Sequence, residues 1–248
     1  MRTTKNSAAV DAKVVERGFA ACRCCRLSPL CQLASEHGTS GSIVCRGRRL
    51  RRGEVLFREG DAFEALFAVC SGSIKTVAHD ARAASQAIGF FIPGELVGIS
   101  GLTARRHTSD AIALEATEIT EIPFGTVSEA MDSVPALRRI VFQILAEQLA
   151  HDELLLLPLV GKKSATERLA SYLLALGQRY AARGFSSTEF PLSMSRNDLS
   201  NHLGLAKETV CRLLARLSEE GLLSLASRRV RIHDLARLTE LAGQRYAA

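Results

Sequence analysis

The sequence predicts an α+β protein in which a β-sheet domain, one long helix and a basic helical domain follow one another along the chain. Three observations carry this prediction. Residues 43–125 consist of short segments rich in Val, Ile, Phe and Ala that are separated by glycines. After Pro135 the apolar residues recur at helical spacing, and the whole net positive charge lies beyond residue 161.

The overall composition is that of an ordinary globular protein, with 248 residues of which 47% are hydrophobic and 23% charged. The longest apolar run, Leu154–Val160, contains Pro158 and is far shorter than the ~18 residues of a membrane-spanning helix. Because Met1–Val10 is polar and lacks the apolar core of a signal peptide, we expect a cytoplasmic protein with no membrane partner. In that reducing compartment we expect the seven cysteines to be thiols or metal ligands rather than disulfides.

The β-sheet domain is predicted from turn signals between short apolar segments. Leu66–Val69 and Ile74–Val77 flank Ser71-Gly72, which predicts two strands joined by a turn. Ala111–Phe124 predicts one further long strand, or two. Regular glycine turns between short strands are typical of an all-β barrel or roll, so we predict a β-roll.

A change of period after Pro135 predicts a long helix that ends at Pro158 and Gly161. Two apolar stripes lie on this helix, and two stripes need two packing partners. We therefore predict that the helix packs on its own domain and on a second copy of the chain, the alternative being a monomer that buries it. The candidate dimerisation seam is Leu137, Val141, Ile144, Gln148, His151 and Leu155, and the second stripe is Phe142, Leu145 and Leu149.

The charge is distributed unevenly along the chain. Residues 1–161 contain 18 basic and 18 acidic residues, whereas residues 162–248 contain 14 basic and 8 acidic residues. A net charge of +6 confined to the last third indicates a segment that meets a polyanion such as nucleic acid. A solvated basic surface without such a partner is the alternative.

The basic segment contains the pattern of a helix-turn-helix. Ser195 is suited to cap a short helix over Arg196–Leu203, Gly204 ends it, and a second helix is predicted over 206–220. The remaining predicted elements are helices at Thr166–Arg183 and Leu235–Tyr246 and a hairpin at Leu222–Ile232. The predicted fold class is thus α+β, with an N-terminal β-roll, a long dimerisation helix and a C-terminal winged helix-turn-helix.

The second helix of this unit is the candidate for reading DNA bases, because the start of such a helix reaches base edges in the major groove. An Arg can pair with guanine and a Glu can accept from the cytosine amino group, and Glu208 and Arg212 lie one turn apart. A surface ion pair on an ordinary helical hairpin is the alternative. The candidate DNA-binding residues are Arg196, Lys207, Glu208, Thr209, Cys211, Arg212, Arg228 and Arg229, with Arg231 as a further phosphate contact.

Several short motifs occur together in this chain. They are Gly60-Asp61, Ser71-Gly72-Ser73-Ile74-Lys75, Pro93-Gly94-Glu95-Leu96-Val97-Gly98, Ala113-Leu114-Glu115, Glu121-Ile122-Pro123-Phe124, and Leu203-Gly204-Leu205 with Glu208-Thr209 and Arg212. With the order of the elements, they make residues 22–240 resemble the Crp/Fnr superfamily of transcription regulators, in its FNR (fumarate and nitrate reduction regulator) oxygen- and redox-sensing branch. Cys211 departs from that pattern, which has a serine there, so we expect a relaxed preference at one base pair and sensitivity to thiol oxidation.

The resemblance implies a cyclic-nucleotide-binding-like jelly roll as the β-roll and a homodimeric activator that binds a palindromic operator with TTGAT-like half-sites. It also implies a contact with RNA polymerase. The expected domains are a Cys-rich sensor segment at 1–40, the β-roll at 41–133, the dimerisation helix at 134–160 and the winged helix-turn-helix at 161–248. The sequence shows no phosphate loop, catalytic triad or paired carboxylates at chemical spacing, so we do not expect an enzyme.

The resemblance further implies a 4Fe-4S cluster that is held by three N-terminal cysteines and a fourth in the β-roll. Cys22, Cys25 and Cys31 match the N-terminal spacing. The chain departs at the fourth position, where Thr120 stands just before Glu121. The fourth ligand is then Cys70, Cys45, Cys24 or a group that is not a cysteine, and these alternatives stay open.

Other uses of the thiols and of the β-roll compete with the cluster. Closely spaced cysteines also suit zinc or a disulfide switch, and inert thiols are a further alternative. In the nucleotide-binding branch of the superfamily, a Gly-Glu pair reads the ribose and an arginine in an Arg-Ser/Thr-Ala triplet neutralises the phosphate. Gly94-Glu95 is present here, but His107-Thr108-Ser109 replaces the triplet. Arg105 and Arg106 are shifted from the position of that arginine. A cyclic nucleotide is therefore disfavoured, because its phosphate would lack a charge-assisted partner.

Overall fold

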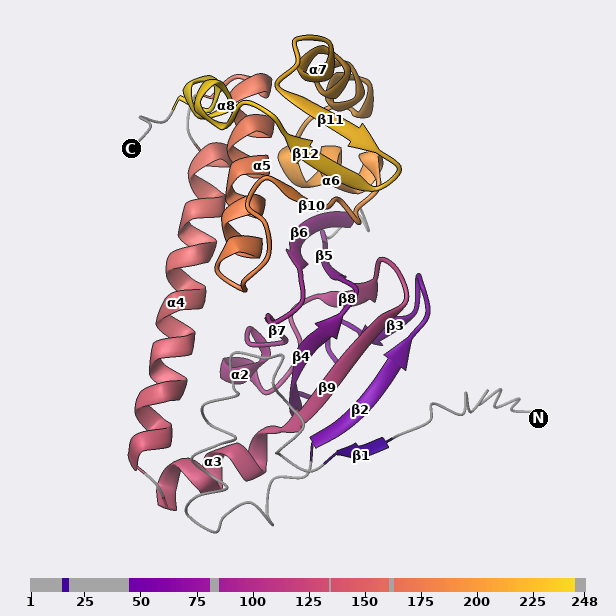
Figure 1. Ribbon diagram of the computed structural model, residues 1–248. Helices are drawn as coiled ribbons and strands as arrows, with labels where there is room; N and C mark the ends of the chain where they lie inside the picture. The colour runs from indigo at the N-terminus through magenta and orange to yellow at the C-terminus, as the bar shows by residue number, and fades with distance from the viewer. Residues whose placement is uncertain (1–14, 18–44, 81–84, 134, 161–162, 244–248) are drawn as a thin grey trace, which may run out of the picture.

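The structure is a computed structural model that describes residues 15–17, 45–80, 85–133, 135–160 and 163–243. Figure 1 shows a β-sheet domain, the long helix α4 (Pro135–Val160) and a helical domain near the far end of that helix. The predicted α+β class is confirmed, with its β-roll, long helix and C-terminal winged helix-turn-helix. None of the described helices is long and apolar enough to cross a membrane.

The β-roll consists of two antiparallel sheets whose facing side chains form a core around Val69, Ile74 and Ile119. In order, the first sheet contains β1 (Val15–Arg17), β2 (Cys45–Leu50), β9 (Thr117–Pro123), β4 (Ala65–Ser71) and β7 (Leu96–Val97). The second contains β3 (Val55–Phe57), β8 (Asp110–Ala113), β5 (Ile74–His79) and β6 (Ser85–Phe91). The segment 111–124, predicted as one strand or two, forms two strands that belong to different sheets.

Helices cover the outer face of the first sheet. The helices α3 (Phe124–Ser133) and α4 pack on Leu66, Ala68 and Ile122, and this second core is separate from the one between the sheets. The helix α3 was not predicted, because the strand pattern was expected to run through Phe124. The short helix α2 (Gly101–Ala104) was not predicted either.

The long helix corrects the predicted dimerisation seam. Leu137 and Ile144 are 0% and 6% exposed and lie in the core between α4 and the protomer's own sheet, with Val141 packed against the same core. They cannot also face a second copy. Gln148 is half-buried, and the side chains of His151 and Leu155 lie outside the described residues. The outward residues belong instead to the second stripe, where Phe142 and Leu149 are 65% and 62% exposed.

The C-terminal domain is a winged helix-turn-helix on a three-stranded sheet with the strand order β10-β12-β11. Its elements are α5 (Ala165–Ala181), β10 (Glu189–Pro191), α6 (Arg196–Leu203), α7 (Lys207–Glu219), β11 (Leu223–Ala226), β12 (Arg229–Ile232) and α8 (Leu235–Leu241). The predicted bounds of α6 are confirmed, and α8 ends earlier than predicted.

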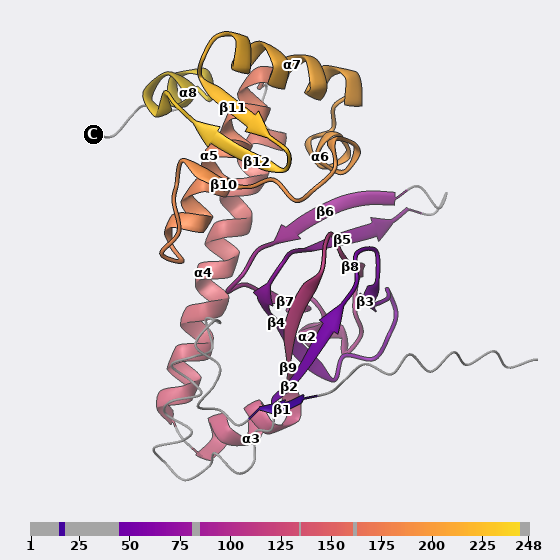
Figure 2. The ribbon, with the colours of Figure 1, turned by 45° about the vertical axis from the view of Figure 1, so that its right-hand side comes forward.

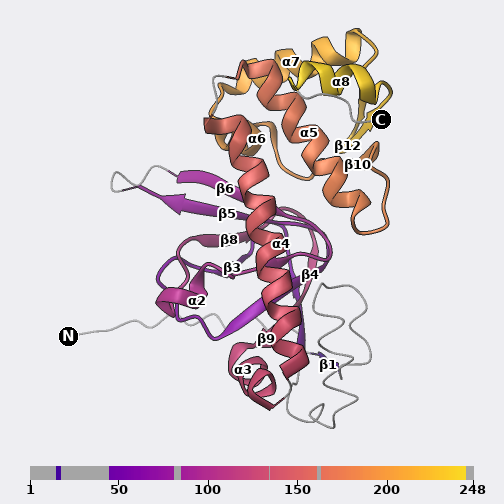
Figure 3. The ribbon, with the colours of Figure 1, turned by 90° about the vertical axis from the view of Figure 1, so that its left-hand side faces the viewer.

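The two domains lie against each other. Figure 2 shows α6 directly above the β5–β6 hairpin, and Figure 3 shows α4 running beside the β-roll toward α5. One hydrophobic cluster joins them, since Ala87 and Phe90 of β6 belong to the same core as Tyr172 of α5 and Leu199 of α6.

Candidate nucleic-acid interface

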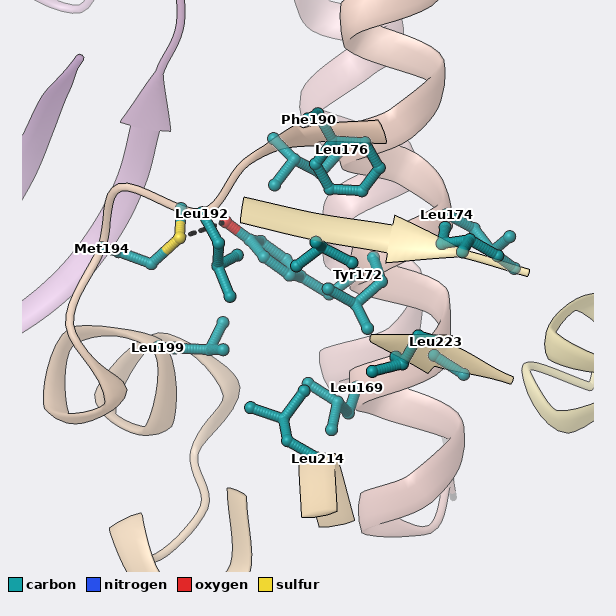
Figure 4. Packing of buried hydrophobic residues seen from close by; sticks show 14 of the residues in the cluster. Leu169, Tyr172, Leu174, Leu176, Phe190, Leu192, Met194, Leu199, Leu214 and Leu223 are labelled. Carbon is teal, nitrogen blue, oxygen red and sulfur yellow. Dashed lines mark hydrogen bonds between the residues drawn. The ribbon is translucent and has the colours of Figure 1, made fainter. Parts of the chain in front are cut away.

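The helix α7, the candidate for reading DNA bases, is held in its domain by its apolar face. Val210 and Leu214 of α7 are 0% and 1% exposed and pack in the core that also holds Leu199 of α6. Figure 4 shows Leu199 and Leu214 close to Leu169 and Tyr172, which come from α5. Because this face is fully covered, the orientation of α7 within its domain is fixed.

The turn between the two helices has the backbone that its sequence predicts. Ser195 caps α6 through a reciprocal capping box with Asp198, which confirms the predicted cap. Gly204 ends α6 in the left-handed region at φ 63°, where a residue with a Cβ would be strained. Ala206 then stands at the N-cap of α7.

The opposite face of α7 is open to solvent. Lys207, Glu208, Cys211 and Arg212 are exposed and Thr209 is half-buried. Within the described part of the chain, neither Glu208 nor Arg212 has a salt-bridge partner, so the alternative of a mutual surface ion pair is not realised here. The polar groups at the start of this helix are therefore available to a ligand.

Three of the remaining basic candidates line a cavity between the start of α6 and the wing of the domain, which is the β11–β12 hairpin (residues 223–232). This cavity of about 260 Å³ is lined by Arg196 at the start of α6 and by Arg228 and Arg229 of the wing, together with Ser195 and Ser227. Arg228 has no salt bridge among the described residues, whereas Arg229 and Arg231 lie 3.8 and 2.7 Å from the carboxylate of Glu189. Three predicted cationic side chains thus share one recess between α6 and the wing.

A second group of candidates lies in the β-roll, around Thr120 of β9. The neighbouring strand β4 pairs Ala68 with Thr120, and its register shifts between Val69 and Ser71. Cys70 stands at this irregularity, and its Sγ lies 3.1 Å from the hydroxyl of Thr120. The thiol is therefore in direct contact with the side chain at the sequence position where a cysteine was expected.

The other flanking strand carries Cys45. In β2, Gly47 pairs with Thr120, and Cys45 precedes Gly47 by two residues and pairs with Arg17 of β1. Cys22, Cys24, Cys25 and Cys31 lie outside the described residues. Within the described ranges no three His, Cys, Asp or Glu side chains are grouped as metal ligands are.

The carboxylate that a cyclic nucleotide would need is already engaged. Glu95 is 3% exposed and accepts hydrogen bonds from two nitrogens of the Arg179 guanidinium group, at 2.9 and 2.5 Å, and from the backbone amide of Ile92 at 2.9 Å. Arg183 adds a contact at 2.8 Å. Burial alone would raise the pKa of Glu95, but the charge and hydrogen bonds of Arg179, with Arg183, outweigh it and hold that pKa below its usual value.

The arginines near the expected phosphate position point elsewhere. Arg106 donates to the carbonyl of Gly60 at 2.8 Å, and the guanidinium of Arg105 lies over the ring of Phe124 at 5.3 Å. His107 is buried and stacked on Phe57 with ring centroids 3.6 Å apart. These contacts support the expectation that this β-roll is not built for a cyclic phosphate.

Sequence reasoning missed the residues that join the two domains. Arg179 and Arg183 were predicted only as part of an amphipathic helix, and Asn201 was not singled out. Their partners lie 84 residues away or more along the chain. No local pattern signals a pair so distant, apart from the unusual position of Arg179 among the buried residues of α5.

Two family descriptions match this chain. Residues 47–133 match the cyclic nucleotide-binding domain, and residues 167–241 match the Crp-like helix-turn-helix domain. The β-roll and the α5–α8 unit thus each correspond to a known type of domain.

Relatives match nearly the whole chain. The transcriptional activator protein anr of Pseudomonas aeruginosa is 42% identical over 226 residues, which are 90% of this chain and 92% of that protein. The anaerobic regulatory protein of Haemophilus influenzae is 36% identical over 90% of this chain and 88% of its own length. Among solved structures, FixK2 from Bradyrhizobium japonicum aligns with a TM-score of 0.72 and 27% identity, over 83% of this chain and all of that one.

Proposed function

Because the chain belongs to the Crp/Fnr family of transcription regulators, in its FNR branch, we propose that it is an anaerobic activator that binds a palindromic operator as a homodimer and responds to oxygen or redox state through a 4Fe-4S cluster. Relatives named as an anaerobic regulatory protein and as a fumarate nitrate reduction regulatory protein support the anaerobic role. RNA polymerase is the further partner that an activator requires.

The observation that carries DNA recognition is the exposed start of α7, where Glu208 and Arg212 lie on a helix whose other face is fully packed. A rigid helix with unpaired base-reading groups is what major-groove recognition needs. The test is fluorescence anisotropy with a duplex carrying an inverted repeat of TTGAT, against a scrambled duplex, over a range of salt concentrations. We expect selective binding that weakens steeply with salt. Equal affinity for both duplexes would contradict the proposal.

A second copy of the chain is the partner proposed for the outward stripe of α4. Phe142 and Leu149, at 65% and 62% exposure, are the large apolar side chains of that helix that its own domain leaves uncovered among the described residues. A two-fold dimer would bury this stripe against itself and present two recognition helices to one duplex. Analytical ultracentrifugation of Leu149→Glu should show monomers, with Arg139→Glu on the exposed polar face of α4 as the matched control.

The donors for a cluster are three closely spaced cysteines and one thiol of the β-roll. Cys22, Cys25 and Cys31 have suitable spacing, and iron–sulfur clusters usually take four thiolates. For the fourth we favour Cys70, because its sulfur lies 3.1 Å from the hydroxyl of Thr120, which occupies the position of the family's cysteine. A bound cluster would supply an oxygen-sensitive redox centre. In this chain the thiol would come from Cys70 on β4 instead of from the position of Thr120 on the neighbouring strand β9, so a fourth thiolate would still be available.

Chain connectivity supports this donor set. Arg17 and Cys45, which bound the segment that carries the N-terminal cysteines, are paired in the same sheet as Thr120. That segment therefore starts on β1, three strands from β4, and ends on β2, two strands from β4, which carries Cys70.

The test is anaerobic purification followed by iron and sulfide analysis and a visible spectrum before and after air. Cys70→Ala should lose the cluster, and adding Thr120→Cys to that variant should restore it, whereas Cys211→Ser on the exposed face of α7 should keep it. A cluster that survives Cys70→Ala but not Cys45→Ala would assign the fourth ligand to β2. Zinc in place of iron, or a metal-free protein whose thiols form disulfides in air, would contradict the cluster and support the two thiol alternatives.

A further inference from the structure

The interface between the β-roll and the DNA-binding domain contains a buried cluster of one carboxylate and two guanidinium groups. Glu95 lies in the loop before β7, and Arg179 and Arg183 lie at and just beyond the end of α5. The side chains of Glu95 and Arg179 are 3% and 4% exposed, and that of Arg183 is 11% exposed. Both oxygens of the carboxylate are used across the domain boundary.

The carboxylate is itself held rigidly. Gly94, at φ 88°, forms a tight turn before Glu95, and the carboxylate accepts from the amide of Ile92 at 2.9 Å. The amide of Val69 donates to the carbonyl of Glu95 at 2.9 Å, which ties the loop to β4. Arg179 also donates to the carbonyl of Phe90 in β6, so its planar guanidinium group is fixed on two sides.

A second set of contacts holds α6 on the β5–β6 hairpin. Lys75 of β5 pairs with Asp198 of α6 at 2.5 Å. The side chain of Asn201 accepts from the amide of Ala87 at 2.5 Å and donates to the carbonyl of Ser85 at 3.0 Å. His202 donates from Nδ1 to the carbonyl of Ala87 at 2.9 Å. The domain is therefore fixed at two separate points, one on α5 and one on α6, and both helices pack against α7.

This docking leaves the DNA-reading face open. Lys207, Glu208 and Arg212 remain exposed, and in Figure 1 α7 lies on the side of its domain that faces away from the β-roll. The contacts thus do not cover the DNA-binding surface. They set its direction relative to the β-roll and to α4.

We propose that Glu95 is a positioning residue for operator recognition. Through its contacts with Arg179 and Arg183, Glu95 holds α7 at a fixed angle to α4. That angle sets the spacing between half-sites that the dimer accepts. The inference rests on the proposed function, since spacing has meaning only for a dimer on an inverted repeat. In this chain the carboxylate that corresponds to the ribose-binding group of nucleotide-binding relatives acts as an internal contact between domains.

The experiment compares Glu95→Gln with the unaltered protein, purified under the same anaerobic conditions, on three duplexes. These carry two TTGAT half-sites one helical turn apart, the same half-sites with two base pairs inserted between them, and a single half-site. Because only the fraction of protomers with a correctly oriented α7 binds both half-sites well, we expect an affinity loss of about tenfold on the first duplex. Binding to the second and third duplexes should change by less than about twofold, since a misdirected domain still reads one half-site.

Two further variants keep the test decisive. Lys75→Ala removes the ion pair of the other docking point, at a side chain that is 23% exposed. It should relax the spacing preference in the same direction by a smaller factor, and it remains informative if Glu95→Gln fails to fold. Glu95→Asp retains the charge and should recover part of the preference. Folded, dimeric Glu95→Gln and Lys75→Ala variants that keep the original spacing preference would overturn the inference. If the unaltered protein itself does not prefer the inverted repeat to a single half-site, the proposed function fails first.

Discussion

Two clusters in this chain have the same composition and opposite surroundings. Glu95 with Arg179 and Arg183 is buried between the domains, with the carboxylate and the first guanidinium 3% and 4% exposed. Glu189 with Arg229 and Arg231 lies at the wing, where the side chains are 34%, 56% and 60% exposed. In each cluster one carboxylate contacts two arginines, so the two clusters differ mainly in how far their side chains are exposed to solvent.

The comparison shows that burial decides what such a cluster can do. Out of water, a charge that loses its partner is costly, so the buried cluster can hold two domains in one orientation. In water the same pairing contributes little, and its arginines can exchange one anion for another. The wing cluster is thus suited to give up Glu189 for a DNA phosphate, and the buried cluster is suited to resist exchange.

The largest expected effect is on stability at the buried cluster. Glu95→Gln removes the charge that balances two guanidinium groups, and breaking a buried ion pair in this way costs about 3–5 kcal/mol of unfolding free energy. Urea denaturation of the dimer, followed by circular dichroism, measures it. A loss below about 1 kcal/mol would mean that the cluster behaves as an exposed one, and the contrast between the two sites would disappear.

The next effect concerns an arginine that has no carboxylate partner in the described chain. Arg212→Ala should weaken binding to an inverted repeat of TTGAT by about 1–3 kcal/mol, the value of one bidentate contact with a base. Binding to random DNA should change much less, because phosphate contacts carry no sequence information. Arg216→Ala is the matched control, since Arg216 lies one turn further along α7 and pairs with Glu220 at 2.8 Å. Equal losses on both DNAs would exclude base reading by Arg212.

Two buried histidines, His107 and His202, show how burial acts on a side chain that stays neutral. Burial lowers the pKa of His107 and of His202 in the folded chain below the usual 6.5, with the nearby charge of Arg179 adding to the effect at His202. Because the unfolded chain binds the proton more tightly, their contribution to stability is complete above pH 6.5 and is lost as the pH falls below it. The lowered pKa of Glu95 affects stability in a separate, more acidic pH range, because its contribution is lost only as the pH falls below 4.5.

Thermal unfolding between pH 7.5 and 5 measures this loss. His107→Gln and His202→Gln should each flatten the profile, whereas His233→Gln, at an exposed position, should leave it unchanged. A profile that is flat in the unaltered protein would show that neither imidazole resists protonation.

Local patterns explain which elements the sequence predicted. The cap at Ser195, the left-handed Gly204 and the apolar spacing of Val210 and Leu214 are short-range features, so α6 and α7 were found within a residue or two. The exposure of the candidate DNA-binding residues of α7 followed from that placement, because the polar side of an amphipathic helix faces water.

Contacts between distant segments explain what was missed. The stripe of α4 that packs on its own sheet and the stripe that faces outward are equally apolar, so spacing alone assigned Leu137 and Ile144 to the wrong partner. Likewise the approach of Cys70 to Thr120 depends on a register shift between β4 and β9, which the sequence does not signal. The pairing of Glu95 with Arg179 depends on how the two domains dock.

The smallest expected effect on stability is at the wing, where a substitution should increase the affinity for DNA instead of lowering it. Glu189→Gln should change the unfolding free energy by less than about 1 kcal/mol, because Arg229 and Arg231 remain hydrated. The same substitution removes an anion that competes with phosphate, so affinity for an inverted repeat and for random DNA should rise together by a factor of roughly two to five. Anisotropy titrations at low and high salt measure this gain, which should shrink as salt screens the wing. A fall in affinity would mean that Glu189 orients the wing arginines for DNA, and the exposed cluster would then share the positioning role of the buried one.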